Sequence, residues 1–220
     1  MKRRKKISKK RKFLDKKIVL SIGIIATVVL GLVYYKVFLQ SPQIKFSLRA
    51  AIIDQLGFGD TENPEFNNTV TNLLENAGFN VSYHRSETIT VSFYRELAKY
   101  NYGLIILRVH SALREDKSTV DLFTSENYTD THADIYRAMY GSGALVKGEY
   151  SWEPGKYYFA ITSKFIENLE GYFPKSIIIA MGCWSLKPDI EESKSMAAAF
   201  TKKGAKAYIC LLYTSDAADE

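Results

Sequence analysis

Cysteine and histidine are scarce in this chain, and their scarcity excludes several kinds of site. The 220 residues include two cysteines, Cys183 and Cys210, and three histidines, His84, His110 and His132. Two cysteines cannot supply the disulfide framework that stabilises many small exported domains. Neither His84 nor His132 has a second histidine, a cysteine or a carboxylate at the spacing of a zinc site. The sequence therefore predicts no metal site and no cofactor.

A phosphate-binding loop and a second domain are also lacking. Gly141-Ser142-Gly143 is a turn, because no Gly-Lys-Ser/Thr and no strand-to-helix context accompany it. A length of 220 residues leaves room for one folded domain and little else, which excludes a large multidomain enzyme.

The last eleven residues, 210–220 (CLLYTSDAADE), break the pattern that precedes them. This string resembles the translation of a transposon-type sequencing adapter, so we set it apart as a non-native tail. On that interpretation Cys210 is not a natural residue, and the natural chain continues beyond Ile209. Cys183 is then the single cysteine of the folded part. It is either a buried apolar side chain or a reactive thiol.

Acidic residues are nearly absent from the first 17 positions, where eleven Lys and Arg accompany one Asp. The whole chain has a formal net charge of +6, but residues 18–209 hold 19 basic and 20 acidic residues. The basic character therefore belongs to a short tail, and we expect no nucleic-acid partner. A nuclear-localisation or nucleic-acid role for this tail would require that the apolar segment after it lie outside a membrane.

Residues 18–39 form a long apolar run. Ile18 to Tyr35 carry no charge, and the apolar character continues past Lys36 to Leu39. A helix needs about 20 apolar residues to cross a bilayer, and no side of this segment is polar, as it would be in a core helix. A cleaved signal peptide would have a shorter apolar run that ends in small residues. We therefore predict an uncleaved transmembrane helix in contact with the lipid bilayer.

The basic tail also predicts an orientation. Lys and Arg beside a transmembrane helix favour the cytoplasm for their side, so residues 1–17 are expected inside the cell. The protein is then a single-pass protein of the cell membrane. Residues 40–46 form a linker, and residues 47–209 form a domain on the outer side.

Within residues 47–209, short apolar runs alternate with segments of helical periodicity, which is typical of a parallel sheet covered by helices. The apolar runs predict strands at 48–56, 79–84, 104–109, 176–181 and 205–209. Helices are expected at 63–78, 91–100, 163–169 and 190–203, the first of them capped by Asn63. The predicted fold is an α/β, three-layer domain with a mostly parallel sheet.

Residues 113–160 interrupt this alternation. They are polar and rich in tyrosine, and residues 152–156 (WEPGK) have the composition of a hairpin turn. We interpret the segment as an insertion between two core strands.

Chemistry in an open α/β sheet is expected beyond the carboxyl ends of its strands. The first strand ends near Asp54, the third at His110-Ser111, and the fourth at Gly182-Cys183-Trp184. If the third and fourth strands are neighbours, His110 and Cys183 meet above the same edge of the sheet. An imidazole beside a thiol can take its proton, and the backbone N–H groups of Cys183 and Ser111 can bind an oxyanion.

The two strand ends IILRVHS and IIIAMGC resemble the histidine and cysteine strands of the caspase, gingipain and clostripain superfamily of cysteine peptidases. The resemblance covers most of residues 47–209 and implies a caspase-like fold. It implies that His110 is the acid/base and Cys183 the nucleophile of a catalytic dyad, and that Asp54 and Trp184 are candidates to line a substrate pocket. Asp54 is alternatively a polar strand terminus.

The chain departs from the superfamily pattern at two places. Ser111 follows His110, where the family usually has Gly, and the Gly182-Cys183-Trp184 setting differs from the common surroundings of the family cysteine. Both departures bear on hydrolysis more than on the fold.

Three functions stay open from the sequence. The first is a membrane-anchored cysteine endopeptidase that cleaves a protein or peptide substrate outside the cell. The second is a non-catalytic caspase-like module, anchored in the membrane, whose tyrosine-rich insertion binds a protein or a glycan. The third is an α/β domain whose strand pattern only mimics the superfamily. This third function would be contradicted if the strands that precede His110 and Cys183 end side by side.

Overall fold

A computed structural model of the chain describes residues 20–36 except 22 and 24, and residues 46–114, 119–182 and 195–211. The chain divides into two compact units, Met1–Ile44 and Lys45–Glu220. In the first unit, the described residues of 20–36 are helical, and their apolar side chains are exposed. Across the described residues, no helix has both the length and the apolar character needed to cross a membrane. The rest of the predicted anchor and the basic tail lie outside the described residues.

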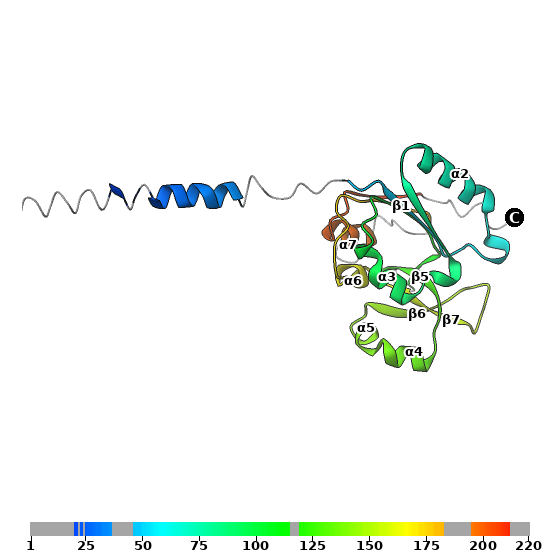
Figure 1. The fold of residues 1–220 in the computed structure, drawn as a ribbon. Helices are drawn as coiled ribbons and strands as arrows, with labels where there is room; N and C mark the ends of the chain where they lie inside the picture. Colours follow the sequence, from blue (N-terminus) through cyan, green and yellow to red (C-terminus); the bar gives the residue numbers. More distant parts are fainter. Residues whose placement is uncertain are drawn as a thin grey trace, which may run out of the picture. The chain divides into compact units, whose positions relative to one another are not determined.

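The second unit is built on a five-stranded parallel sheet, which we call sheet A (Figure 1). Its strands are β1 (Arg49–Asp54), β2 (Asn80–Arg85), β3 (Leu104–Arg108), β8 (Ile177–Ala180) and β9 (Ala207–Cys210). They are ordered β2-β1-β3-β8-β9, and every neighbouring pair is parallel. Each strand matches one expected from the sequence, so an α/β fold with a parallel sheet is confirmed. β9 includes Cys210, the first residue of the tail that we set apart.

Helices cover both faces of sheet A. Successive side chains of its central strands point to opposite faces, and both sets of side chains are apolar. One set packs against α2 (Pro64–Asn76) and comprises Ala50, Ile52, Leu104 and Ile106. The other set belongs to the main core and comprises Ala51, Ile53, Ile105, Leu107 and Ile178. This second face is covered by α3 (Val91–Glu96), α6 (Ser163–Glu167) and α7 (Met196–Lys202) (Figure 1). Burial on both faces explains why β1 and β3 read as continuous apolar runs.

The four helices over sheet A all begin at a polar side chain that accepts a hydrogen bond from the backbone N–H three residues later. The caps are Asn63 for α2, Thr90 for α3, Thr162 for α6 and Ser195 for α7. Asn63 is the cap that the sequence predicted. α3 is shorter than expected, because its continuation tightens into the 3-10 turn Leu97–Lys99. Residues 190–194 of the expected last helix lie outside the described residues.

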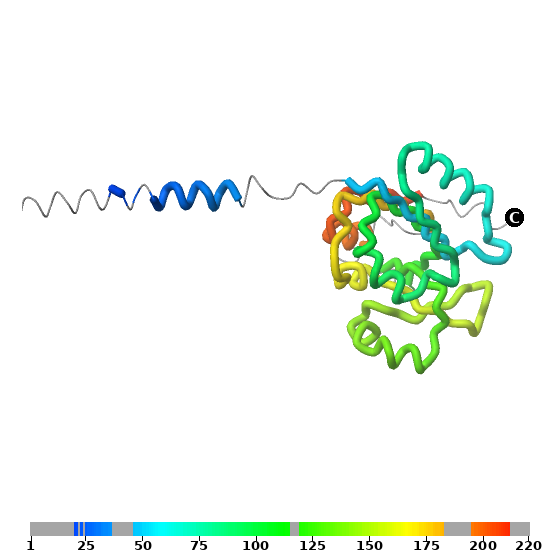
Figure 2. Tube along the Cα trace, viewed as in Figure 1, coloured from blue at the N-terminus to red at the C-terminus, as the bar shows by residue number. Residues whose placement is uncertain are grey.

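The predicted insertion is a second sheet, which we call sheet B and which the sequence analysis did not anticipate. Its strands are β4 (Ser111–Leu113), β5 (Val120–Asn127), β6 (Leu145–Glu149) and β7 (Tyr157–Ile161). They are antiparallel in the order β4-β5-β7-β6, and the expected hairpin turn lies between β6 and β7. The short helices α4 (Asp130–Ile135) and α5 (Arg137–Gly141) connect β5 to β6. Figure 2 follows the chain from β3 through sheet B and back to α6 and β8.

Sheet B has two apolar faces of different composition. One face joins the main core through Leu122, Leu145, Phe159 and Ile161. The other carries a separate buried cluster of Phe123, Tyr150, Tyr158 and Ala160. This second face is built largely of tyrosine and alanine and lacks the large aliphatic residues typical of a buried strand. The sequence analysis therefore interpreted the segment as a polar insertion.

Gly103, the residue before β3, ties β1 to β8 through its backbone. Its N–H donates to the carbonyl of Arg49 at 2.8 Å, and its own carbonyl accepts from the N–H of Ile177 at 2.8 Å. A Cβ added at this position would lie 1.9 Å from the carbonyl oxygen of Ser47. Only a residue without a side chain fits there.

We therefore expect Gly103→Ala to lower the free energy of unfolding by about 1–3 kcal/mol, because backbone must shift to relieve the overlap. Chemical denaturation of the full chain measures this value. The matched control is Gly141→Ala in α5, where an added Cβ meets nothing within 4 Å. Equal stability of the two variants would contradict the close approach at Gly103.

Candidate functional site

The candidate site lies at the edge of sheet A where β3 and β8 end. The two strands are adjacent and parallel, with Leu107 opposite Ala180, and the N–H of Met181 donates to the carbonyl of Leu107 at 2.8 Å. The sequence analysis made the meeting of His110 and Cys183 conditional on neighbouring strands, and β3 and β8 meet that condition. His110 follows β3, and the buried Gly182 is the last described residue after β8. Cys183 and Trp184 lie outside the described residues.

The backbone of His110 joins sheet A to sheet B. Its N–H donates to Oε1 of Gln55 at 2.9 Å, and its carbonyl accepts from the N–H of Phe123 in β5 at 2.9 Å. Gln55 is itself buried and donates through Nε2 to the hydroxyl of Tyr150 at 2.8 Å. Gln55 therefore holds the backbone of His110 and one of its aromatic neighbours. The sequence held one sign that Gln55 could have this positioning role, which is that a polar residue directly follows a buried strand.

The imidazole of His110 lies among three aromatic rings that meet it nearly at right angles. The distances between ring centroids are 4.8 Å to Phe123, 4.9 Å to Tyr150 and 5.0 Å to Trp152. Tyr150 is stacked on Trp152 at 4.8 Å and on Phe123 at 4.9 Å. No described residue forms a hydrogen bond with the imidazole. The three aromatic residues come from sheet B and its hairpin, and none of them was a predicted site residue.

Burial among these rings lowers the pKa of His110 from 6.5 to about 4. A charged imidazolium loses hydration there, so the neutral form is favoured. At neutral pH the ring is consequently unprotonated, which is the state that can accept a proton from a thiol.

Phe123 is held against sheet B by a glycine. A Cβ added at Gly148 in β6 would lie 2.4 Å from the Cζ atom of Phe123. The ring therefore occupies the space that a side chain at position 148 would take. Because Phe123 also touches His110, this glycine helps to set the position of the aromatic cluster.

Ser111, a predicted oxyanion donor, is buried as the first residue of β4 and is paired with Leu122 of β5. The other predicted donor is Cys183, outside the described residues. The structure thus describes one of the two backbone groups in the predicted oxyanion hole.

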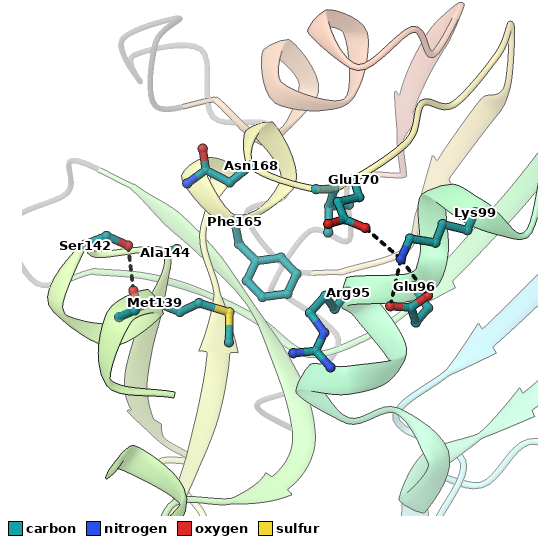
Figure 3. A pocket seen from close by; sticks show the side chains of 11 residues that line it. Arg95, Glu96, Lys99, Met139, Ser142, Ala144, Phe165, Asn168 and Glu170 are labelled. Carbon is teal, nitrogen blue, oxygen red and sulfur yellow. Dashed lines mark hydrogen bonds and ion pairs between the residues drawn. The ribbon is translucent and has the colours of Figure 1, made fainter. Parts of the chain in front are cut away.

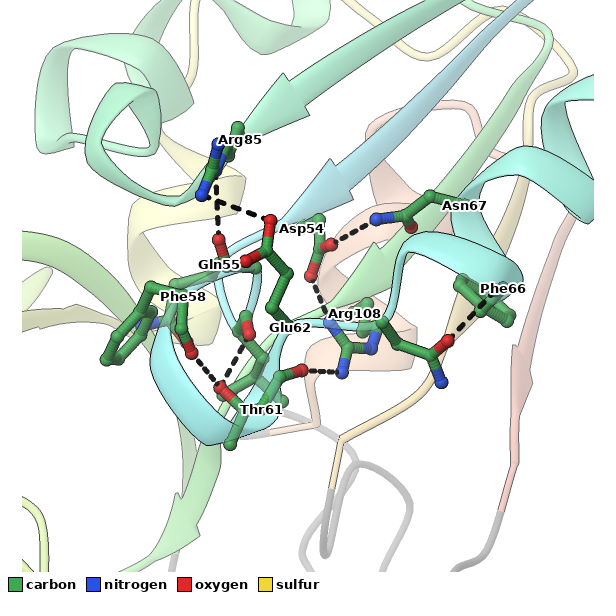
Figure 4. Close-up of polar contacts among 12 residues, drawn as sticks. Asp54, Gln55, Phe58, Thr61, Glu62, Phe66, Asn67, Arg85 and Arg108 are labelled. Carbon is green, nitrogen blue, oxygen red and sulfur yellow. Dashed lines mark hydrogen bonds and ion pairs between the residues drawn. The ribbon is translucent and has the colours of Figure 1, made fainter.

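Asp54 is completely buried, and partners from the protein itself surround its carboxylate (Figure 4). Oδ1 pairs with Nη1 of Arg108 at 2.6 Å, and Oδ2 accepts from Nδ2 of Asn67 and from the hydroxyl of Tyr83, both at 2.9 Å. Burial, helped by the bond to Asp54, raises the pKa of Tyr83 to about 12. A basic group of a substrate would have to displace Arg108 to reach this carboxylate.

A groove lies on the outer face of sheet B beside the aromatic cluster. It has a volume of about 750 Å³, and its lining includes Phe123 and Tyr150, which also touch His110. Arg114 and Asp121 form a two-bond ion pair in its wall, with N–O distances of 2.7 and 3.0 Å. The groove was not visible in the sequence, because its lining is assembled from strands β4 to β7.

Metal-binding groups are not gathered anywhere in the described part of the chain. No cluster of three His, Cys, Asp or Glu side chains is present among those residues. His84 packs against Phe93, Tyr100 and Tyr102, and Nδ1 of His132 lies 3.6 Å from Glu126.

Comparisons of the chain with protein-family models, with curated proteins and with solved structures find no match.

The lowered pKa of His110 predicts a specific pH dependence of stability. In the unfolded chain the imidazole takes up a proton near pH 6.5, whereas in the folded chain it does so near pH 4. The unfolded state therefore binds more protons between these values, and folding stability falls as the pH drops through this window. The gap between the two pKa values corresponds to at most about 3 kcal/mol.

His110→Phe should remove this part of the pH dependence, because phenylalanine does not titrate. The measurement is the free energy of unfolding at pH 7 and pH 4 for both proteins, with the exposed-site variant Tyr172→Phe as a control. NMR titration of the His110 ring gives its pKa directly. A folded-state pKa near 6.5 would show that the ring is not enclosed as described.

Proposed function

We propose that the chain is a membrane-anchored cysteine peptidase of the caspase-like type, with Cys183 as nucleophile and His110 as acid/base. The observation that carries the proposal is the pairing of β3 with β8. Leu107 of β3 lies opposite Ala180 of β8. His110 comes three residues after Leu107, and Cys183 comes three residues after Ala180. The chain therefore leaves sheet A toward both residues at the same edge. This adjacency counts against a fold that only mimics the strand pattern of the superfamily.

The proposed reaction uses the neutral imidazole of His110 first as a base. It accepts the proton of the Cys183 thiol, and the thiolate attacks the carbonyl carbon of the scissile peptide bond. The imidazolium then gives its proton to the leaving amine as the C–N bond breaks. Water, deprotonated by the same imidazole, hydrolyses the thioester and releases the acid product. Because burial disfavours the charged ring, the imidazolium would give up its proton readily.

A protein or peptide substrate is favoured by the groove on sheet B. Its volume of about 750 Å³ suits several residues of an extended chain, and it begins at the rings that touch His110. Apolar floor residues such as Ala112, Val146 and Ala160 can contact side chains of the substrate. The Arg114–Asp121 pair supplies polar groups at the wall.

The membrane anchor is part of the same proposal. The apolar side chains of the described residues in 20–36 are exposed, as lipid-facing residues would be in water. Eleven basic residues before this segment favour a cytoplasmic N-terminus. The unit from Lys45 onward would then work outside the cytoplasm.

A non-catalytic binding module is the second candidate, and the surroundings of His110 favour it. The ring is enclosed by Phe123, Tyr150 and Trp152, and within the described residues no carboxylate is bonded to it. Trp152 is 59% exposed and stacked on the buried Tyr150, so the tryptophan side chain is held open to a partner. Exposed aromatic faces of this kind bind the apolar faces of sugars and protein side chains.

Thiol-directed labelling of the full chain tests the enzyme. A peptide probe with a thiol-reactive group at its C-terminus should label the wild type and Cys210→Ala, but not Cys183→Ala. His110→Phe should slow both labelling and peptide hydrolysis by about a hundredfold or more, because the general base is lost. Cys210→Ala is the matched control, since it removes the other thiol of the chain.

Retained hydrolysis in Cys183→Ala would overturn the proposal. Absence of labelling in the wild type, together with a glycan or protein ligand whose binding is lost in Trp152→Ala, would instead support the binding module.

The anchor predicts that the full chain stays with membranes after extraction at alkaline pH. Val28→Asp combined with Val29→Asp should shift it to the soluble fraction, because each carboxylate at the centre of a transmembrane helix costs roughly 2.5–3.5 kcal/mol. The control replaces the same two residues with Leu. Protease added outside intact cells should cleave the unit after Lys45, and protection of that unit would contradict the orientation.

A further inference from the structure

A second cavity shares no lining residue with the groove beside His110. It has a volume of about 530 Å³ and lies between α3 with its following turn, α5, and α6 with its following loop (Figure 3). This volume is within the usual range for small-ligand sites, about 300–1,000 Å³. Nothing in the proposed peptidase reaction uses the cavity.

The floor of the cavity is apolar. Phe165, Leu169 and Ala144 line it, and all three are buried members of the main core. Met139 of α5 packs against the same core and adds a flexible thioether to the wall. In Figure 3 the ring of Phe165 points into the open space. A ligand that fills this cavity therefore meets apolar carbon and sulfur at its inner end.

Four charged residues line the mouth of this cavity, and three of them form ion pairs with one another. Lys99 bonds to Glu96 at 3.0 Å and to Glu170 at 2.9 Å, so it holds both carboxylates. Arg95 lines the same cavity, and among the described residues its guanidinium makes no hydrogen bond or salt bridge, although its positive charge acts after Lys99 to lower the pKa of Glu170. Among the described residues, Arg95 is thus the cation of the mouth that no side chain binds directly.

These charges select the class of ligand. A guanidinium binds a carboxylate through two parallel hydrogen bonds. Counted together with Arg95, the group of Lys99, Glu96 and Glu170 has no net charge, so the mouth has no excess of positive charge for a dianion such as a phosphate ester. A single negative charge on an apolar body matches both Arg95 and the floor.

We propose that this cavity binds a monocarboxylate with a compact apolar body, with its carboxylate on Arg95 and its apolar part against Phe165 and Met139. The same chemistry is present in a free aryl- or alkyl-carboxylic acid and in the C-terminus of a peptide that ends in an apolar residue. The site is independent of Cys183 and His110.

Calorimetric or NMR titration of the full chain tests the site with four probes. These are 3-phenylpropionate, its amide, an N-acetylated tripeptide that ends in Phe with a free carboxylate, and the same tripeptide with an amidated C-terminus. We expect at least one carboxylate to bind and its amide to bind at least about tenfold more weakly, because the ionic hydrogen bonds to Arg95 are lost. Which carboxylate binds distinguishes the free acid from the peptide terminus.

Variants locate the binding. Arg95→Ala should weaken the carboxylate by about tenfold or more, and Arg137→Ala, an exposed arginine of α5 that already pairs with Asp134, should leave it unchanged. Ala138→Trp, at an exposed lining position, should block the cavity without disturbing the core. Equal binding of acid and amide, equal binding to Arg95→Ala, or no binding at millimolar concentration would each overturn the proposal. None of these results depends on whether the chain hydrolyses peptides.

Discussion

The buried carboxylate of Asp54 is the constraint around which the edge of sheet A is organised. A fully buried charge is strongly unfavourable unless it is paired and hydrogen-bonded. Arg108 at the end of β3 neutralises it, while Asn67 of α2 and Tyr83 of β2 satisfy its second oxygen. Strands β1, β2 and β3 and helix α2 are thus tied together at the carboxyl end of the sheet. That is the end at which the candidate site lies.

The same ties extend into the second sheet. Gln55 follows Asp54, and its backbone N–H donates to the carbonyl of Arg108 at 3.0 Å. Its side chain then reaches His110 and Tyr150, so one buried residue links the ion pair to the imidazole and to the aromatic cluster. The position of His110 consequently depends on both sheets. A chain of polar contacts of this kind rigidifies a site, because each contact fixes the position of the next residue.

Particular residues explain what the sequence could and could not predict. The strands of sheet A were predictable because burial on both faces demands apolar runs such as 104–107, and α2 because Asn63 and Pro64 mark its start. Sheet B was missed because Tyr150, Tyr158 and Gly148 build its outer face, and such residues in a short segment also suit a loop. The sequence analysis placed His110 and Cys183 at one edge on the condition that their strands are neighbours; β3 and β8 are neighbours, whereas Cys183 lies outside the described residues. The aromatic enclosure of His110 depends on side chains distant in sequence, and no local pattern contains that information.

The connectivity of the two sheets has a consequence for how the domain folds. All of sheet B lies in the chain between β3 and β8, yet these two strands pair directly. Closing so long a loop costs chain entropy before any contact compensates for it, and such non-local parallel pairing slows folding. Sheet B can form from nearer neighbours, as its β6–β7 hairpin shows. The pairing of β3 with β8, at whose ends the candidate site lies, is therefore expected to be among the last parts of the domain to form.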